Sequence, residues 1–203
     1  MAYVNPGNLM LNPSGPGTSQ HYARVANPPV HPGAMHAPMP DHYTLRDHRR
    51  IERVPRSPHY IPPYESIPAV TFSIGGWPGA RLRDVLKLNV LVDNPYDTPF
   101  VDQGWRTTVV CLEWPGYEQV TFTDRQRTRI NTVVQGRPVT RQEIAKEVCG
   151  LLFHFHTFAK RYSCLPGWEK WALTDDNIVA FDVVLLSMHY YRNVWIPEFY
   201  VIE

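Results

Sequence analysis

The sequence predicts an α+β fold, in which a small antiparallel sheet packs on one long helix and a proline-rich extended arm precedes both. The first observation behind this prediction is a segregation of residue types. All six tryptophans and all eight phenylalanines of the 203-residue chain follow residue 68, whereas 13 of its 20 prolines come before residue 69. A segment without these large rings buries little apolar area, and so gains little to offset its ordering entropy. We therefore expect residues 1–68 to be an arm, disordered or docked, and residues 69–203 to be a single α+β domain.

The second observation is a helical pattern that begins at a capping box. Thr140 and Glu143 form a T-x-x-E signature, which satisfies two backbone donors at a helix start. Apolar residues then recur at spacings of three and four, which predicts one buried stripe on a helix of about six turns: Ile144, Val148, Leu151, Phe155, Phe158 and Tyr162. Phe153 falls nearly opposite this stripe, so either the helix is covered on both sides or Phe153 marks a partner surface.

The third observation is a set of short strand-like segments between turn residues. Residues 69–74, 106–113 and 129–134 are rich in β-branched side chains and are followed by Gly and Pro. Residues 178–188 fit either a helix or a hairpin with residues 194–202, and we favour the hairpin. Pro197 would then place the last strand at a sheet edge or a bulge, because proline cannot donate to a ladder.

The arm carries side chains that suit docking onto another surface. Tyrosine offers contact area at modest entropic cost, and proline lowers the cost of ordering. The predicted anchors are Tyr3, Leu9, Tyr22, Tyr60 and Tyr64.

Within the arm, Thr44 and Asp47 resemble a capping pair and predict a short helix. The same stretch concentrates basic residues that could contact phosphates: Arg49, Arg50, Arg53 and Arg56. Because Asp47 and Glu52 interrupt this cluster, we favour a solvated, self-paired face over nucleic-acid binding.

Charge and cysteine content exclude several classes of function. A formal net charge of +1 is unlike that of general nucleic-acid or membrane binders, which concentrate basic residues. Cys111, Cys149 and Cys164 fit neither an even disulfide framework nor a CxxC metal knuckle, so reduced thiols are expected. No secretory signal or membrane-spanning apolar stretch is expected. These features favour an intracellular, cytoplasmic protein, with the nucleus as an alternative.

The sequence shows no established catalytic or metal-binding pattern. His154 and His156 project about 200° apart on a helix, so they cannot chelate one ion as an i, i+4 pair does. Cys149 or Cys164 could pair with a histidine such as His189 only through folding. We therefore expect no metal, no cofactor and no identifiable catalytic residue.

Three motifs, in order along the chain, give a resemblance. Residues 114–117 read W-P-G-Y, residues 137–141 read R-P-V-T-R at the helix start, and residues 195–199 read W-I-P-E-F. Over roughly Arg81 to Val201 the chain resembles a family of uncharacterised α+β proteins from mushroom-forming (basidiomycete) fungi. Ile196 and Glu198 depart from the polar pair expected there. The resemblance implies a fungal, intracellular domain and supplies no activity.

These observations favour a non-enzymatic protein-interaction or self-assembly protein. The arm would dock on a neighbouring copy or another protein, and a homo-oligomer is expected. Near turns, tryptophans serve interfaces as well as cores, so Trp168 and Trp195 join Phe153 as predicted interface residues. One alternative is an enzyme whose site is assembled from Cys and His distant in sequence. The other is nucleic-acid binding through Arg46–Arg56.

Overall fold

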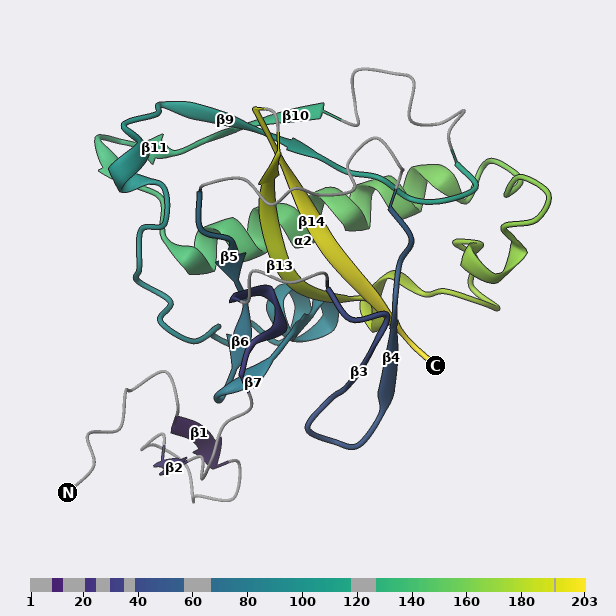
Figure 1. The fold of residues 1–203 in the computed structure, drawn as a ribbon, viewed down its shortest axis with the longest axis horizontal. Coiled ribbons are helices and arrows are strands. Elements are labelled where there is room, and N and C mark those ends of the chain that lie inside the picture. Colours follow the sequence, from purple (N-terminus) through teal and green to yellow (C-terminus); the bar gives the residue numbers. More distant parts are fainter. Residues whose placement is uncertain are drawn as a thin grey trace.

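The computed structural model describes residues 9–12, 21–24, 30–34, 39–56, 67–117, 127–191 and 193–203, with the backbone alone for the first two ranges. The described chain is a mixed α+β structure dominated by a curled antiparallel sheet, with one α-helix behind it (Figure 1). The α+β class is therefore confirmed. Within the described residues, no helix is both long enough and apolar enough to cross a bilayer.

Within the described residues, the main sheet contains eight strands. Five of them follow the order β10-β9-β14-β13-β5, and β3, β4 and β8 join at the sides. The eight strands are β3 (His42–Thr44), β4 (Arg50–Arg53), β5 (Val70–Thr71), β8 (Ala80–Arg81), β9 (Thr107–Cys111), β10 (Arg127–Asn131), β13 (Val184–Tyr191) and β14 (Val194–Ile202).

Three small antiparallel pairs and one long helix complete the regular structure. The pairs are β1 (Leu9–Asn12) with β2 (His21–Arg24), β6 (Ser73–Ile74) with β7 (Trp77–Pro78), and β11 (Val133–Val134) with β12 (Arg137–Pro138). The helix is α2 (Arg141–Ala159). Short 3₁₀ turns lie at Pro32–Ala34, Val101–Gln103, Glu169–Trp171 and Ala180–Asp182, and a π-helical turn lies at Arg83–Lys87.

The centre of the sheet is the β13–β14 hairpin, which confirms the hairpin over the helix for the C-terminal part of residues 178–188. Asn193 at its turn has a φ of 71°, a left-handed conformation that asparagine tolerates. Nearly every residue of both strands is buried. Because the two faces are both covered, the strands read as continuous apolar runs without alternation. For this reason the sequence did not distinguish a helix from a strand at residues 178–188.

The sheet edge predicted for Pro197 is wrong, because β14 is an inner strand, whereas the bulge given as the alternative agrees with a register shift beside it, between Leu185 and Ser187. One side of β14 pairs with β13 along its length, and Pro197 lies opposite Met188. The other side pairs in parallel with β9 at Trp195 and antiparallel with β4 from Tyr200 to Ile202. On that side, Pro197 lies between the residue paired with β9 and the residues paired with β4. No described strand therefore accepts a hydrogen bond from the position where proline has no N–H. A proline is therefore tolerated inside this sheet.

Part of the predicted arm lies within the sheet. β3 and β4 form a hairpin, and β4 pairs with the end of β14. The expected short helix after Thr44 is wrong: Asp47 instead accepts hydrogen bonds from the backbone and side chain of Arg49 inside the hairpin turn. Ile51 is fully buried against Leu186 and Tyr200. Residues 39–56 thus dock on their own chain.

Helix α2 begins where the capping box predicts. The Glu143 N–H donates to the Thr140 hydroxyl, and the Thr140 N–H donates to the Glu143 carboxylate at 2.9 Å. The helix ends at Ala159, before Tyr162, which is 42% exposed. The buried stripe is rotated from the predicted one, since Leu151, Phe155 and Phe158 are only half-buried. Its buried members are Gln142, Ile144, Ala145, Val148, Cys149, Leu152, His156 and Ala159.

The predicted strand at residues 69–74 corresponds to β5 and β6, which are separated at Phe72, and it is followed by a turn at Gly75 and Gly76, as expected. β6 folds back on β7 through Gly75 and Gly76, whose N–H groups both donate to the Asp93 carboxylate. Burial raises the pKa of Asp93 to about 6, although these two hydrogen bonds act in the opposite direction. The other two predicted strands correspond to β9, and to β10 followed by β11.

Candidate functional site

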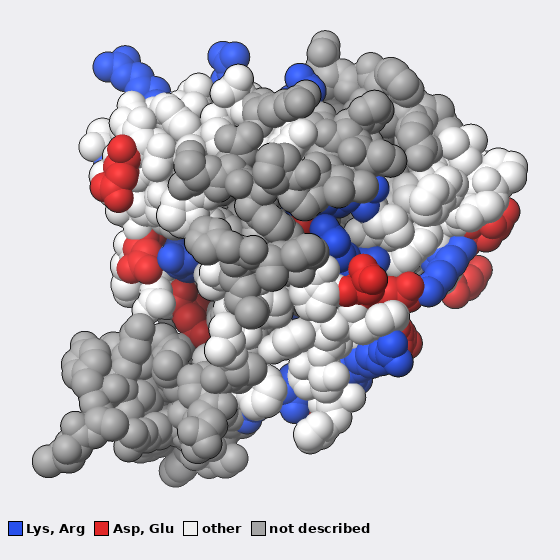
Figure 2. Space-filling view, in the orientation of Figure 1, with Lys and Arg blue, Asp and Glu red and all other residues white. Residues whose placement is uncertain are grey.

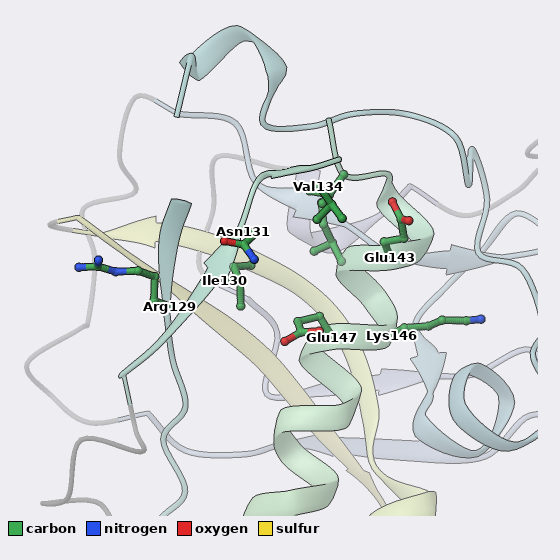
Figure 3. Close-up of a pocket in the computed structure, with 9 residues that line it drawn as sticks. Arg129, Ile130, Asn131, Val134, Glu143, Lys146 and Glu147 are labelled. Carbon is green, nitrogen blue, oxygen red and sulfur yellow. The ribbon is translucent and has the colours of Figure 1, made fainter. Parts of the chain in front are cut away.

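The described surface has a hollow of about 400 Å³ between strand β10 and helix α2 (Figure 3). β10 contributes Arg129, Ile130 and Asn131, three successive residues. Successive side chains of a strand point to opposite faces, so a hollow lined by all three must follow the edge of the strand. The remaining lining residues are Val134, Val139, Glu143, Ile144, Lys146 and Glu147.

The strand wall of the hollow is the last strand of the described sheet. Arg127–Asn131 pairs antiparallel with Thr107–Cys111 of β9, and β10 ends the strand order on that side. Only Ile130 is buried, at 4% exposure, and the flanking Arg129 and Asn131 are exposed. The strand therefore presents one edge outside the sheet, which is the usual template for adding another strand.

The helix wall is the first two turns of α2, held in place by its capping box. Arg137 donates to the Glu143 carboxylate at 2.9 Å, and the Thr140 N–H and hydroxyl donate to it as well. The hydrogen bond from Arg137 is the largest cause that lowers the pKa of Glu143 to about 2, with the Thr140 N–H next. Glu143 is thus a fixed, ionised part of the wall that is already paired.

The other charged groups of the hollow are not paired within the described chain. Arg129, Lys146 and Glu147 have no ion-pair partner among the described residues. In Figure 3, the Glu147 side chain points across the hollow toward β10, while Arg129 and Lys146 point away in opposite directions. The floor is apolar, from Ile130, Val139 and Ile144, which are each less than 9% exposed.

A buried carboxylate, that of Glu198, lies on strand β14 beside two arginines of the segment 39–56. Glu198 is 1% exposed and accepts two hydrogen bonds of 3.0 Å from Arg53, one from Nε and one from Nη2. Arg56 also pairs with Glu198 and donates to the Ile196 carbonyl. A buried carboxylate is stable only when it is paired, so these two guanidinium groups keep Glu198 in the fold.

Three histidines lie beside or near this sheet, of which His156 and His189 are buried and His31 is half-buried. His189 lies 3.0 Å from the Ser187 hydroxyl, and burial followed by the nearby Arg56 and Arg53 lowers its pKa to about 3. His31 contacts the Phe72 carbonyl, and burial lowers its pKa also. His156 on α2 contacts the Ile178 carbonyl, again with a pKa lowered by burial. All three are neutral at pH 7 and act as hydrogen-bonding residues of the core.

The arginines predicted as a basic contact are paired with acidic side chains of the same chain. Arg49 pairs with Asp47 and Arg50 pairs with Glu203, while Arg53 and Arg56 pair with Glu198. The face drawn in Figure 2 shows basic and acidic side chains mixed over its described part, without a continuous basic area. Phosphate binding needs cations that are available at the surface, so this geometry does not favour nucleic acid.

The predicted interface residues fall in different places. Trp195 lies in the core at 1% exposure, because β14 is an inner strand, and its ring packs on Phe100 and Tyr190. Phe153 stacks on Phe181 with ring centroids 5.3 Å apart, so the helix is covered on that side too. Trp168 is 37% exposed and keeps a surface for contact.

The predicted anchors of the arm are not tested by the structure. Tyr3, Tyr60 and Tyr64 lie outside the described residues. Leu9 and Tyr22 are described in the backbone alone, in the β1–β2 pair.

The cysteines and histidines do not form a recognisable catalytic centre in the described chain. The hollow is lined by none of Cys149, Cys164, His154, His156 and His189. Cys149 is fully buried, which raises the pKa of its thiol and leaves it unreactive. His154 is exposed and His156 is buried, as their angular separation on the helix predicts. Within the described residues, no group of three or more His, Cys, Asp or Glu side chains could hold a metal ion.

Sequence reasoning missed both the hollow and the buried carboxylate. The lining residues come from two segments that meet only in the fold, and charged residues at a helix start are ordinary in any sequence. Glu198 did carry a signal, because an acidic residue inside a continuous apolar strand needs a cation from elsewhere. The excess of arginines in residues 49–56 could have indicated the source of that cation.

Comparison with protein-family models, curated proteins and solved structures finds no match to this chain.

Proposed function

We propose that this chain is a non-enzymatic protein-interaction domain that binds an extended segment of another protein along strand β10. The observation that carries the proposal is the hollow between a terminal strand and a helix. A peptide that adds to a sheet edge gains backbone hydrogen bonds from the strand and side-chain contacts from the neighbouring surface. The apolar floor supplies such contacts, and the charged rim of Arg129, Lys146 and Glu147 supplies orientation.

The experiment that tests this function uses selected peptides and a blocking variant. Seven-residue peptides would be selected from a displayed random library on the folded full-length chain, and their affinity would then be measured by fluorescence polarisation. Asn131→Trp places a large ring at the hollow, and Arg83→Trp places the same ring at an exposed residue that does not line it.

We expect the selected peptides to lose at least about tenfold in affinity with Asn131→Trp and to keep their affinity with Arg83→Trp. Peptides with alternate N-methylated amides should also bind weakly, because strand addition depends on main-chain hydrogen bonds. If no peptide is enriched, or if the enriched peptides ignore the blocking variant, the proposal fails.

We also propose the finer architecture, in which the antiparallel sheet packs on the single long helix. The support is one hydrophobic cluster that contains Val148 and Leu152 of α2 together with Leu185 and Phe199 of the hairpin. Leu152→Ala should then lower the free energy of unfolding by about 2–5 kcal/mol, the usual cost of a cavity in a core. A cost below about 1 kcal/mol in denaturant unfolding would contradict it.

Membership of the fungal family, an intracellular location and self-association stay proposals that rest on the sequence. Imaging of a fluorescent fusion in a basidiomycete host tests the location, and a secreted product would contradict it. Light scattering on the full-length chain tests self-association. A shortened chain that starts at residue 69 is unsuited to that test, because it lacks β3, β4 and both arginines that pair with Glu198.

A further inference from the structure

The chemistry of the two walls indicates which segment the hollow fits, if the chain binds an extended segment as proposed above. Glu147 extends from the helix wall and points across the hollow, whereas Arg129 lies on the strand wall and points away from the helix. Neither has an ion-pair partner among the described residues. A bound segment would thus meet a carboxylate on one face and a guanidinium on the other.

A strand that pairs with β10 would present alternate side chains to these two environments. The side chains of an extended segment alternate between its faces, as do those of β10 itself. Ile130 faces the core beside α2, and the exposed Arg129 points away from the helix. The face of the bound segment toward α2 would meet an apolar floor and Glu147. Its other face would lie beside Arg129.

We propose that the partner is an extended segment of about five residues in which acidic side chains alternate with aliphatic ones, with one basic side chain on the aliphatic face. The length follows from the five residues of β10. The acidic side chains would pair across the strands with Arg129, since opposite charges on neighbouring strands stabilise pairing. The basic side chain would meet the Glu147 carboxylate of α2. Aliphatic side chains would cover Ile130 and Ile144.

A second copy of β10 fits this edge poorly. In an antiparallel pairing centred on Arg129, each Arg129 would lie opposite the same residue of the other copy. Like charges directly opposite each other destabilise strand pairing. We therefore propose a segment of a different protein as the occupant of this edge.

The test uses two synthetic peptides with reversed charges. The matching peptide has glutamate at positions two, four and six, lysine at position five, and valine elsewhere. The reversed peptide has lysine at positions two, four and six, glutamate at position five, and valine elsewhere. Affinities would be measured by isothermal titration at about 50 mM and 150 mM salt, because charge pairs at the surface weaken with screening.

The native chain should bind the matching peptide at least about tenfold more tightly than the reversed one. Arg129→Glu together with Glu147→Lys should reverse this preference. Arg83→Glu, an exposed charge reversal that does not line the hollow, should leave it unchanged. Circular dichroism of each variant would show that the fold is retained.

Three results would overturn the inference. If both peptides bind equally, while Asn131→Trp still weakens the binding of peptides, the proposed partner chemistry is refuted. Strand addition at β10 is then still supported. Failure of both peptides and of the selected library peptides would refute strand addition too. A dimer of the native chain that Asn131→Trp dissociates would show that β10 pairs with itself.

Discussion

The outer edges of strands β14 and β10 differ in whether another strand of the described chain pairs with them. Beyond the contact with β9, the outer edge of β14 is filled by the chain's own β4, which pairs with Tyr200–Ile202. β10 ends the described sheet without such a strand. At the filled edge, two arginines enclose Glu198 at 1% exposure, whereas at β10 the arginine and the carboxylate stay exposed and apart. We therefore propose that the filled edge serves stability and the open edge serves recognition.

The largest expected effect comes from removing the carboxylate of the filled edge. Glu198→Gln would leave Arg53 and Arg56 in place without their buried counter-charge, which costs about 3–5 kcal/mol in other buried pairs. Urea unfolding followed by tryptophan fluorescence measures the loss. The matched control is Glu203→Gln, whose pairs with His42 and Arg50 are solvent-exposed and contribute at most about 1 kcal/mol. Similar losses in both variants would refute the special role of Glu198.

The next effect is a dependence of stability on pH. His31, His156 and His189 have lowered pKa values in the folded chain, so below pH 6.5 the unfolded chain binds more protons and stability falls as the pH falls. For His189, the pH range over which stability falls extends down to about pH 3. Asp93 opposes the trend, because its pKa is raised to about 6 and the folded chain binds the extra proton between about 6 and 3.8.

We expect the three histidines to outweigh the single aspartate, so the urea midpoint should be lower at pH 5 than at pH 7. His189→Gln keeps a polar partner for Ser187 and removes one titrating group. The variant should therefore lose less stability over the same interval. An equal loss in the variant and the native chain would contradict the buried, neutral state of His189.

A smaller effect is expected at the helix wall of the open edge. Thr140→Ala removes the hydroxyl that caps α2 and one contact of Glu143, which typically costs about 1 kcal/mol. Thermal unfolding measures the shift. Thr157→Ala is a suitable control, because this hydroxyl donates only to the Phe153 carbonyl of its own helix. A loss at Thr157 as large as at Thr140 would argue against the cap.

The smallest effect is expected at the open edge itself. Arg129→Ala should change the free energy of unfolding by no more than about 0.5 kcal/mol, as is usual for exposed residues without a specific contact. Arg53→Ala, its counterpart at the filled edge, should cost several times more because it leaves Glu198 with one cation. Equal costs for the two arginines in urea unfolding would remove the distinction between the edges.

Local sequence signals predicted the elements whose contacts are close in sequence. The capping box of Thr140 and Glu143 located the start of α2, and the W-P-G-Y corner is a turn in which Gly116 has a φ of 79°. The division into arm and domain, by contrast, did not anticipate that Ile51 would be buried in the sheet. That contact depends on Leu186 and Tyr200, more than a hundred residues away, and no local pattern encodes such a pairing.

The candidate site was beyond the reach of sequence reasoning for a similar physical reason. Arg129 and Glu147 belong to a short strand and a helix that each look ordinary, and their proposed role depends on the space between the two elements. Trp195 was expected at an interface because it lies near a turn, yet the strand that follows Asn193 is covered on both faces. Composition predicts how much apolar area is buried, but not which residues of a strand remain at an edge.

The most direct measurement is hydrogen exchange of the β10 amides with and without the matching peptide. If a partner strand adds to this edge, exchange should slow on binding for those amides of residues 127–131 that point away from β9, while the amides of Arg50–Arg53 in β4 should be unchanged. Binding that slows exchange elsewhere and leaves β10 unprotected would contradict strand addition at the open edge.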